Sequence, residues 1–220
     1  MVAFINTKDI KITRSTINIP SVDWELKDEN IAYIHIYLFD QSLSSNFNKI
    51  ASEILNSPAK KIILDLRNNP GGYLEIAKEI SGWFLKKGQV VTIENFGGDK
   101  DKKYYKADGN ANFSEYPMVV LIDQGSASAS EILAGTLRDN RNILLIGEKS
   151  FGKGSVQEVL QLRDGSMLKI TIAKWLTPNG NSISEVGLSP DINVEITDAD
   201  SENKKDPQLD KALEIIKNLK

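Results

Sequence analysis

The sequence lacks most of the residues on which common catalytic and metal sites depend. Among its 220 residues there is no cysteine and only one histidine, His35. The absence of cysteine excludes disulfide bonds and thiolate metal sites. His35 lies in the strand-like run 33–38, within a row of aromatic residues, and we interpret it as a structural residue of a sheet. A catalytic centre in this chain therefore has to work without the usual histidine base.

Clustered positive charge and long apolar runs are absent as well. The chain has 27 Lys and Arg against 30 Asp and Glu, a net charge of −3, and its basic residues are scattered. This charge balance does not indicate a basic surface that would bind nucleic acid. No apolar run approaches membrane-spanning length, and the first residues do not form a signal peptide. We expect no nucleic-acid partner, no membrane span, no targeting segment in this chain, and no metal or cofactor.

The most informative pattern is a predicted strand followed directly by a predicted helix. The apolar run 118–122 predicts a buried strand, residues 123–125 form a polar turn, and apolar residues then recur at helical spacing from Ala129. Ser128 lies where the strand passes into the helix. Free N–H groups and the positive end of the helix dipole favour negative charge at such a position. This is a good place for a serine nucleophile.

A lysine in a glycine loop follows the next predicted strand. Residues 143–146 predict that strand, and Lys153 then stands between two glycines. Both candidates also have ordinary explanations, because a serine at a helix start is commonly an N-cap and a lysine between glycines is commonly a solvated loop charge. A serine nucleophile needs a base. If Ser128 is a nucleophile, Lys153 is the best placed base in this chain.

Three blocks of the sequence resemble the signature blocks of the carboxyl-terminal processing proteases, the tail-specific Ser–Lys peptidases of family S41. They are residues 65–72 (DLRNNPGG), 125–131 (GSASASE) and 151–157 (FGKGSVQ). Residues 175–180 (WLTPNG) and 187–192 (GLSPDI) also agree with the family. The blocks occur in the family's order, with its spacing between Ser128 and Lys153, and no catalytic position departs from the pattern. The family usually carries a PDZ domain, for which this chain has no room.

The resemblance implies a role for five residues. Ser128 is the nucleophile, Lys153 is the general base, and Gln157 orients the lysine amine in a Ser–Lys–Gln triad. The backbone N–H groups of Gly72 and Ala129 form the oxyanion hole, which holds the negative oxygen of the tetrahedral intermediate. The expected activity is that of a serine endopeptidase working through an acyl-enzyme.

The base has to be neutral, which a lysine normally is not. A free lysine has a pKa of about 10.4, and burial lowers that value because it disfavours the charged form. We expect the apolar neighbours Phe151 and Val156 to desolvate Lys153. Gln157 carries no charge, so it does not raise the lysine pKa as a carboxylate would. Asp139 matches a family carboxylate, but its position at the end of the predicted helix favours a structural role.

The resemblance also implies the kind of substrate and the location. The substrate would be a protein or peptide with a free apolar C-terminus, cleaved near that end. The protein would act outside the cytoplasm, in the periplasm, the cell envelope or the medium, and it could form a homo-oligomer. Two alternatives stay open: a catalytically impaired peptide-binding core, and a crotonase-like acyl-transfer enzyme. Without substrate and PDZ domain, we expect Ser128 and Lys153 to lie out of hydrogen-bond reach.

The order of elements predicts an α/β fold with a mixed, partly parallel sheet. Strands and helices alternate between residues 61 and 147, which requires crossover connections. The family resemblance adds a core similar to the spiral fold of the Clp protease and crotonase superfamily. The expected divisions are a segment leading into the core (1–30, following the PDZ domain in the family), a serine protease core (31–197), and a polar linker with a C-terminal helix (198–220). Local predictions are extended chain at 10–20, a solvated loop at 97–113 and a hairpin at 156–172.

Overall fold

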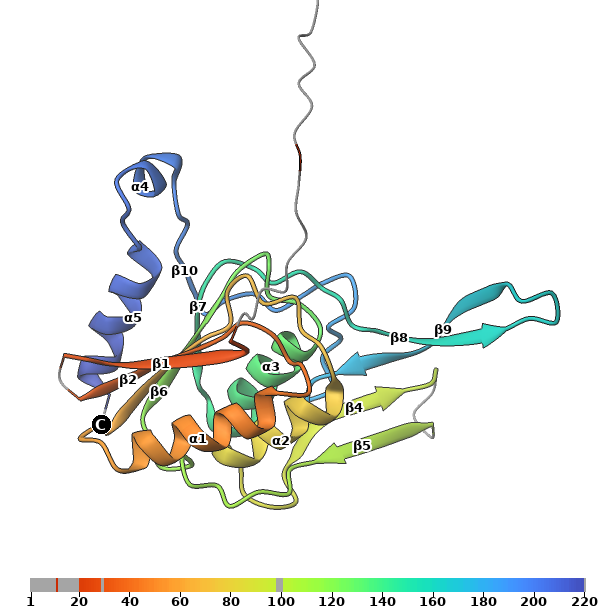
Figure 1. Ribbon diagram of the computed structural model, residues 1–220, viewed down its shortest axis with the longest axis horizontal. Coiled ribbons are helices and arrows are strands. Elements are labelled where there is room, and N and C mark those ends of the chain that lie inside the picture. The colour runs from red at the N-terminus through yellow and green to blue at the C-terminus, as the bar shows by residue number, and fades with distance from the viewer. Residues whose placement is uncertain (1–10, 12–19, 29, 98–100, 220) are drawn as a thin grey trace, which may run out of the picture.

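A computed structural model describes residues 11, 20–28, 30–97 and 101–219 and contains two sheets (Figure 1). The larger has the strand order β1-β2-β3-β6-β7-β10, in which β1 is antiparallel to β2 and the other neighbours are parallel. Its strands are β1 (Val22–Lys27), β2 (Ile31–Ile36), β3 (Lys61–Asp65), β6 (Met118–Ile122), β7 (Leu144–Gly147) and β10 (Ile192–Asn193). The mixed, partly parallel sheet predicted from the sequence is confirmed.

Helices cover both faces of this sheet, which explains why its central strands are apolar throughout. The helices are α1 (Leu43–Leu55), α2 (Leu74–Phe84) and α3 (Ala129–Arg141) on one face and α5 (Pro207–Asn218) on the other. On β6, Val120 faces the core shared with α1, α2 and α3, whereas Val119 faces the core shared with α5. No helix in the described part of the chain is long and apolar enough to cross a membrane.

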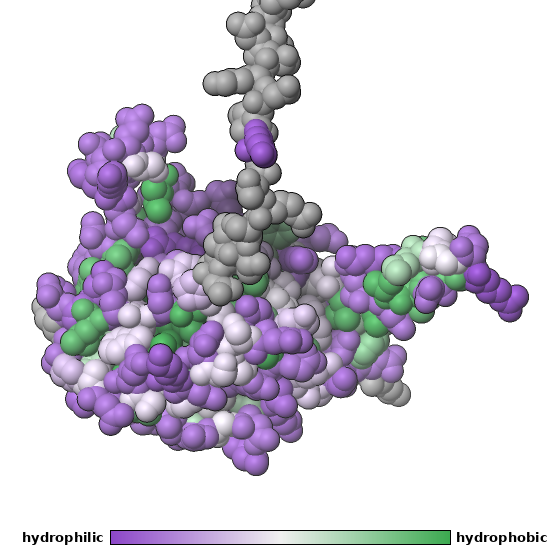
Figure 2. Space-filling view, viewed as in Figure 1, coloured by the Kyte–Doolittle hydropathy of each residue, from purple (hydrophilic) through white to green (hydrophobic). Residues whose placement is uncertain are grey.

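The smaller sheet is antiparallel, with strand order β5-β4-β9-β8. Its strands are β4 (Val90–Asn95), β5 (Lys102–Lys106), β8 (Ser155–Gln161) and β9 (Met167–Leu176). The predicted hairpin is the β8–β9 pair, which extends away from the body of the molecule (Figure 1). Figure 2 shows apolar surface along it. Its exposed apolar residues are Val159, Leu160, Leu162, Met167, Leu168, Ile170 and Ile172.

Two local predictions, the solvated loop at 97–113 and the polar linker that begins at 198, need correction. The loop predicted at 97–113 contains strand β5, because Tyr105 packs against Trp175 with ring centroids 5.5 Å apart and donates a hydrogen bond to Glu94. Within the segment 1–30, the residues of β1 pair with β2 at the edge of the main sheet. The polar linker contains a short helix, α4 (Asp198–Glu202), capped by Thr197. The extended chain predicted at 10–20 lies, apart from residues 11 and 20, outside the described residues.

Candidate active site

The three sequence blocks meet at one edge of the main sheet. They follow the carboxyl ends of β3, β6 and β7, and parallel neighbours end on the same side of a sheet. Backbone hydrogen bonds join the resulting loops. The Ala127 N–H donates to the Asn69 carbonyl over 3.0 Å, and the Phe151 N–H donates to the Ser126 carbonyl over 3.0 Å. The fold therefore brings together the segments that the sequence separates.

Two serines of the run 126–130 hold this arrangement through their hydroxyls. Ser126 Oγ donates to the Leu66 carbonyl over 2.8 Å, and Ser130 Oγ donates to the Asn69 carbonyl over 2.9 Å. Both serines are buried. Their hydroxyls are thus occupied in fixing the loop after β6 against the loop after β3, and neither is available to attack a substrate.

Ser128, between them, is different. It is partly exposed, and its backbone has φ 57° and ψ −112°, a conformation that costs free energy for a residue with a side chain. Ser128 and Glu131 form a capping box: the Ser128 N–H donates to Glu131 over 2.8 Å, and the Ser128 side chain faces the backbone N–H of Glu131. Ser128 Oγ donates no hydrogen bond to any described residue. The strained turn thus presents, at the start of α3, a hydroxyl whose proton is not engaged.

The two predicted oxyanion donors both have unused N–H groups. The residues on either side of Gly72 form backbone hydrogen bonds with Phe39, but the Gly72 N–H makes no hydrogen bond to a described residue. The Ala129 N–H likewise makes no hydrogen bond to a described residue. Gly71 brings the two loops into contact. A Cβ built on Gly71 would lie 2.7 Å from Ser128 Cβ and 2.8 Å from the Ala129 nitrogen, so a side chain cannot fit there.

The glycines on either side of Lys153 allow another close approach. A turn formed by residues 183–187 packs against the lysine loop, and the Glu185 N–H donates to the Gly152 carbonyl over 2.9 Å. A Cβ on Gly154 would lie 2.3 Å from the Ser184 nitrogen. The glycines therefore let this turn lie directly on the backbone that carries Lys153.

The side chains of Lys153 and Gln157 are exposed. Within the part of the chain that the structure describes, Lys153 Nζ forms no hydrogen bond or ion pair, and it makes no contact of this kind with Ser128 Oγ. Phe151 is 67% exposed, so the expectation that it buries the lysine is wrong for this conformation. The structure places Ser128 and the lysine loop together but leaves the Lys153 amine in solvent.

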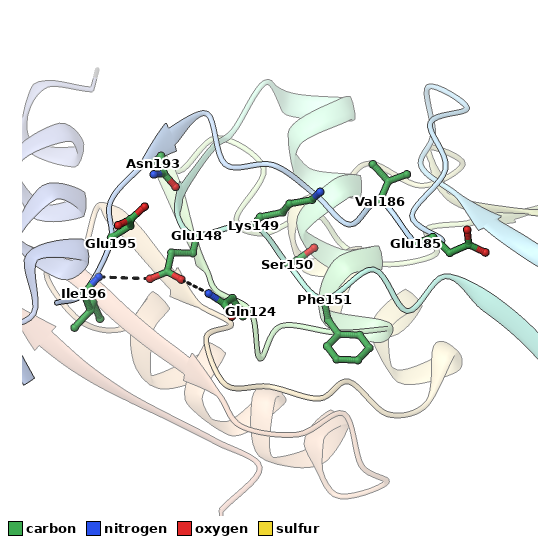
Figure 3. A pocket seen from close by; sticks show the side chains of 10 residues that line it. All are labelled: Gln124, Glu148, Lys149, Ser150, Phe151, Glu185, Val186, Asn193, Glu195 and Ile196. Atoms are coloured by element: carbon green, nitrogen blue, oxygen red, sulfur yellow. Dashed lines mark hydrogen bonds between the residues drawn. The ribbon is translucent and has the colours of Figure 1, made fainter. Parts of the chain in front are cut away.

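A cavity of about 900 Å³ adjoins the lysine loop at the ends of β6, β7 and β10 (Figure 3). Glu148 accepts hydrogen bonds from Gln124 Nε2 over 2.8 Å and from the Ile196 N–H over 3.4 Å. The lining residues are Gln124, Glu148, Lys149, Ser150, Phe151, Glu185, Val186, Asn193, Glu195 and Ile196. No group of three or more potential metal-binding side chains occurs among the residues described.

Sequence reasoning missed a buried ionic network behind the loop after β3. The guanidinium of Arg67 bonds to Asp65 Oδ2 over 2.6 Å and to Asp206, the residue before α5, over 2.8 and 2.9 Å. Burial alone would lower the pKa of Arg67, but the carboxylates of Asp206 and Asp65 raise it above its ordinary value. Burial acts to raise the pKa of Asp206, but the hydrogen bond from Arg67, the hydrogen bonds from the backbone at Leu209 and Gln208, and the charge of Arg67 together lower it below its ordinary value. The network ties the start of the glycine loop to α5.

Asp139 and His35 both make structural contacts. Asp139 accepts a hydrogen bond from the Asn179 N–H over 2.9 Å and so holds the turn after β9. The ring of His35 lies 4.0 Å from that of Tyr37, within the aromatic row of β2. These contacts agree with the structural roles that the sequence favoured for both residues.

Comparison with known proteins gives a consistent result. A sequence model described as "Peptidase family S41" matches residues 30–194. The chain is 39% identical over 197 residues to the carboxy-terminal processing protease CtpA of Bacillus subtilis, which covers 89% of this chain and 42% of that protein. It is 37% identical over 188 residues to a probable CtpA-like serine protease of Staphylococcus aureus, covering 86% of this chain and 38% of the relative. The chain thus spans about two fifths of the length of these relatives.

Solved structures show the same relationship. The photosystem II D1 C-terminal processing protease superposes with a TM-score of 0.74 at 30% identity, covering 83% of this chain and 50% of that one. The tricorn protease, at 22% identity and a TM-score of 0.58, shares the fold. With the family match spanning most of the chain and the signature blocks assembled at one sheet edge, this chain belongs to peptidase family S41.

Proposed function

We propose that this chain is the proteolytic core of a serine endopeptidase that cleaves protein substrates near their C-termini. One observation carries the proposal: of the three serines in the run 126–130, only Ser128 has a hydroxyl that donates no hydrogen bond to a described residue, and its backbone is strained and adjoins two unused N–H donors. Strained conformations of this kind persist mainly at functional sites, where the surrounding structure holds them in place.

The reaction follows from these positions. Ser128 Oγ attacks the substrate carbonyl while its proton passes to Lys153 Nζ. The Gly72 and Ala129 N–H groups hold the resulting oxyanion. When the peptide bond breaks, the lysine returns the proton to the departing amine, and an acyl-enzyme remains. A water molecule then gives its proton to the lysine and attacks the ester, which releases the new carboxyl end and restores the serine.

The exposed lysine sets a condition on this mechanism. A base that takes the Ser128 proton has to lie within hydrogen-bond reach of Ser128 Oγ, so the exposed Lys153 side chain has to turn toward it and lose water before the first step. A substrate segment lying over the lysine loop would exclude that water. Gln157, on the adjoining strand β8, could then hold the amine without stabilising its charged form. Catalytic contacts of this kind often tighten only when substrate is bound.

Three further proposals are based on the family resemblance. The substrate has a free apolar C-terminus, the protein acts outside the cytoplasm, and it forms a homo-oligomer. The relatives named above are described as carboxy-terminal or C-terminal processing proteases. Because this chain spans about two fifths of the curated relatives, its own activity and selectivity have to be measured on the chain itself.

The test is cleavage of two unstructured peptides that are identical except for an apolar or a charged C-terminal residue. We expect weak cleavage with little selectivity between them, because a peptidase core tested by itself holds the substrate at one site and gains no tethering from a second. Ser128→Ala should remove all cleavage. A folded wild-type chain that bound these peptides without cleaving them would favour the peptide-binding alternative, and acyl-CoA turnover would favour the crotonase-like one.

A further inference from the structure

Glu131, in the first turn of α3, is a fully buried carboxylate. None of the ion pairs in the described part of the chain includes it. A buried charge is costly unless hydrogen bonds replace the water that it loses. The groups that bond to Glu131 therefore determine whether this part of the fold is stable, and all of them come from the two catalytic segments.

The two oxygens of this carboxylate are shared between the nucleophile turn and the lysine loop. Oε1 accepts from Ser150 Oγ over 2.6 Å and from the Gly152 N–H over 2.7 Å. Oε2 accepts from the Ser128 N–H over 2.8 Å and from the Lys153 N–H over 2.9 Å. One oxygen atom thus accepts hydrogen bonds from both Ser128 and Lys153. Their backbone nitrogens therefore cannot lie further apart than two hydrogen-bond lengths.

We propose that Glu131 is the positioning residue that sets the separation between nucleophile and base, an inference that rests on the proposed roles of Ser128 and Lys153. The side chain of Lys153 forms no bond that could fix it, so its backbone has to be placed first. Other bonds to the loop, such as Phe151 N–H to Ser126 and Glu185 N–H to Gly152, join it to residues other than Ser128. Of the residues that the structure describes, only Glu131 bonds to both Ser128 and Lys153.

Glu131→Gln is the informative change because it keeps the shape and alters the acceptors. An amide has one acceptor oxygen, and in either orientation its NH₂ group would face a lysine-loop N–H that it cannot bond, that of Gly152 or that of Lys153. We expect the Ser128 or Lys153 backbone to move away, with kcat falling by about 100-fold, the order that a misplacement of about 1 Å can cost, and KM little changed. Amide exchange should become faster at Ser128 and Lys153 but not at Val120 in β6.

Ser150→Ala is the matched control. It removes one hydrogen bond to the same buried carboxylate, so it lowers stability, but both catalytic N–H groups keep their acceptor. We expect it to retain most of kcat. Equal losses of kcat in the two variants would show that Glu131 acts only through stability and would overturn the proposal. So would a Glu131→Gln enzyme with wild-type kcat.

Glu131→Asp keeps the test decisive if the Gln variant does not fold. The shorter carboxylate keeps its charge and its acceptors but cannot reach both segments in the same geometry, so kcat should fall with KM little changed. A folded Glu131→Asp enzyme with wild-type kcat would refute the positioning role. Failure of the proposed function can be told apart from failure of this inference. The former would appear as cleavage by Ser128→Ala, whereas amide exchange measures the hydrogen bonds from Ser128 and Lys153 to Glu131 without any substrate.

Discussion

Gly71→Ala should inactivate the enzyme through contact with the nucleophile turn. Gly71 has φ 95°, which already disfavours a side chain, and the added Cβ would meet Ser128 Cβ at 2.7 Å and the Ala127 carbonyl oxygen at 2.5 Å. Real Cβ atoms do not approach other atoms this closely, so one of the two loops has to move. The strained Ser128 turn and the Ala129 N–H would move with it.

Gly88 provides a control with the same backbone strain. Its φ is 92°, and a Cβ added there would meet nothing within 4 Å. Gly88→Ala should therefore cost only the positive-φ strain, about 1–3 kcal/mol. At about 2–4 °C per kcal/mol for a chain of this size, its melting temperature should fall by several degrees. Gly71→Ala carries the same strain and, in addition, overpacking of about 1–3 kcal/mol.

The assay compares the two variants in melting temperature and in kcat/KM per folded molecule. Gly88→Ala should keep near wild-type activity at a temperature where it is folded. Gly71→Ala should lose about 100-fold or more, because even a displacement of about 1 Å at a catalytic group can cost that much. Equal activities for the two folded variants would refute the claim that the contact between Gly71 and Ser128 positions the nucleophile.

Three further predictions test the base and its surroundings. Lys153→Arg should be as inactive as Lys153→Ala in steady-state cleavage, because arginine stays protonated; near wild-type cleavage would show that residue 153 is not the base. Gln157→Glu should lower kcat, since a carboxylate beside Lys153 would hold the amine in an ion pair; unchanged cleavage would show that residue 157 does not contact the amine. Asp206→Asn should lower the melting temperature at neutral pH. The pKa of Asp206 is lowered in the folded state, so its contribution to stability is present above the ordinary aspartate pKa and is lost as the pH falls through the folded-state pKa. The difference in melting temperature between the variant and the wild type should therefore disappear in acid. A difference that does not change with pH would contradict the ionic role.

The main sheet and its helices were predictable because burial on both faces leaves a strong record in the sequence. The run Met118–Ile122 is apolar at every position because helices lie on both sides of it. Strand β5 was harder to see: it lies at the edge of the smaller sheet, where lysines are common because they discourage further pairing. For β1 the alternation of Val22, Trp24 and Leu26 was a usable signal of an edge strand.

The sequence predicted which residues form the candidate site but not the conformation of their side chains. The motifs indicate Ser128 and Lys153, and the fold brings their segments together, yet no sequence pattern shows that the lysine side chain is exposed. The role of Glu131 had a visible signal, the Ser-x-x-Glu spacing of a capping box at Ser128. Its bonds to the lysine loop depend on a contact over more than twenty residues, which local spacing does not reveal.

The central claim, that Ser128 is the nucleophile, is tested most directly by locating the adduct of a fluorophosphonate. These reagents phosphonylate activated serine hydroxyls, and peptide mass spectrometry of the treated protein identifies the modified residue. The structure predicts one adduct, on Ser128, with none on Ser126 or Ser130, whose hydroxyls are buried and bonded. An adduct on either of these two serines, or no adduct on a preparation that cleaves peptides, would contradict the account.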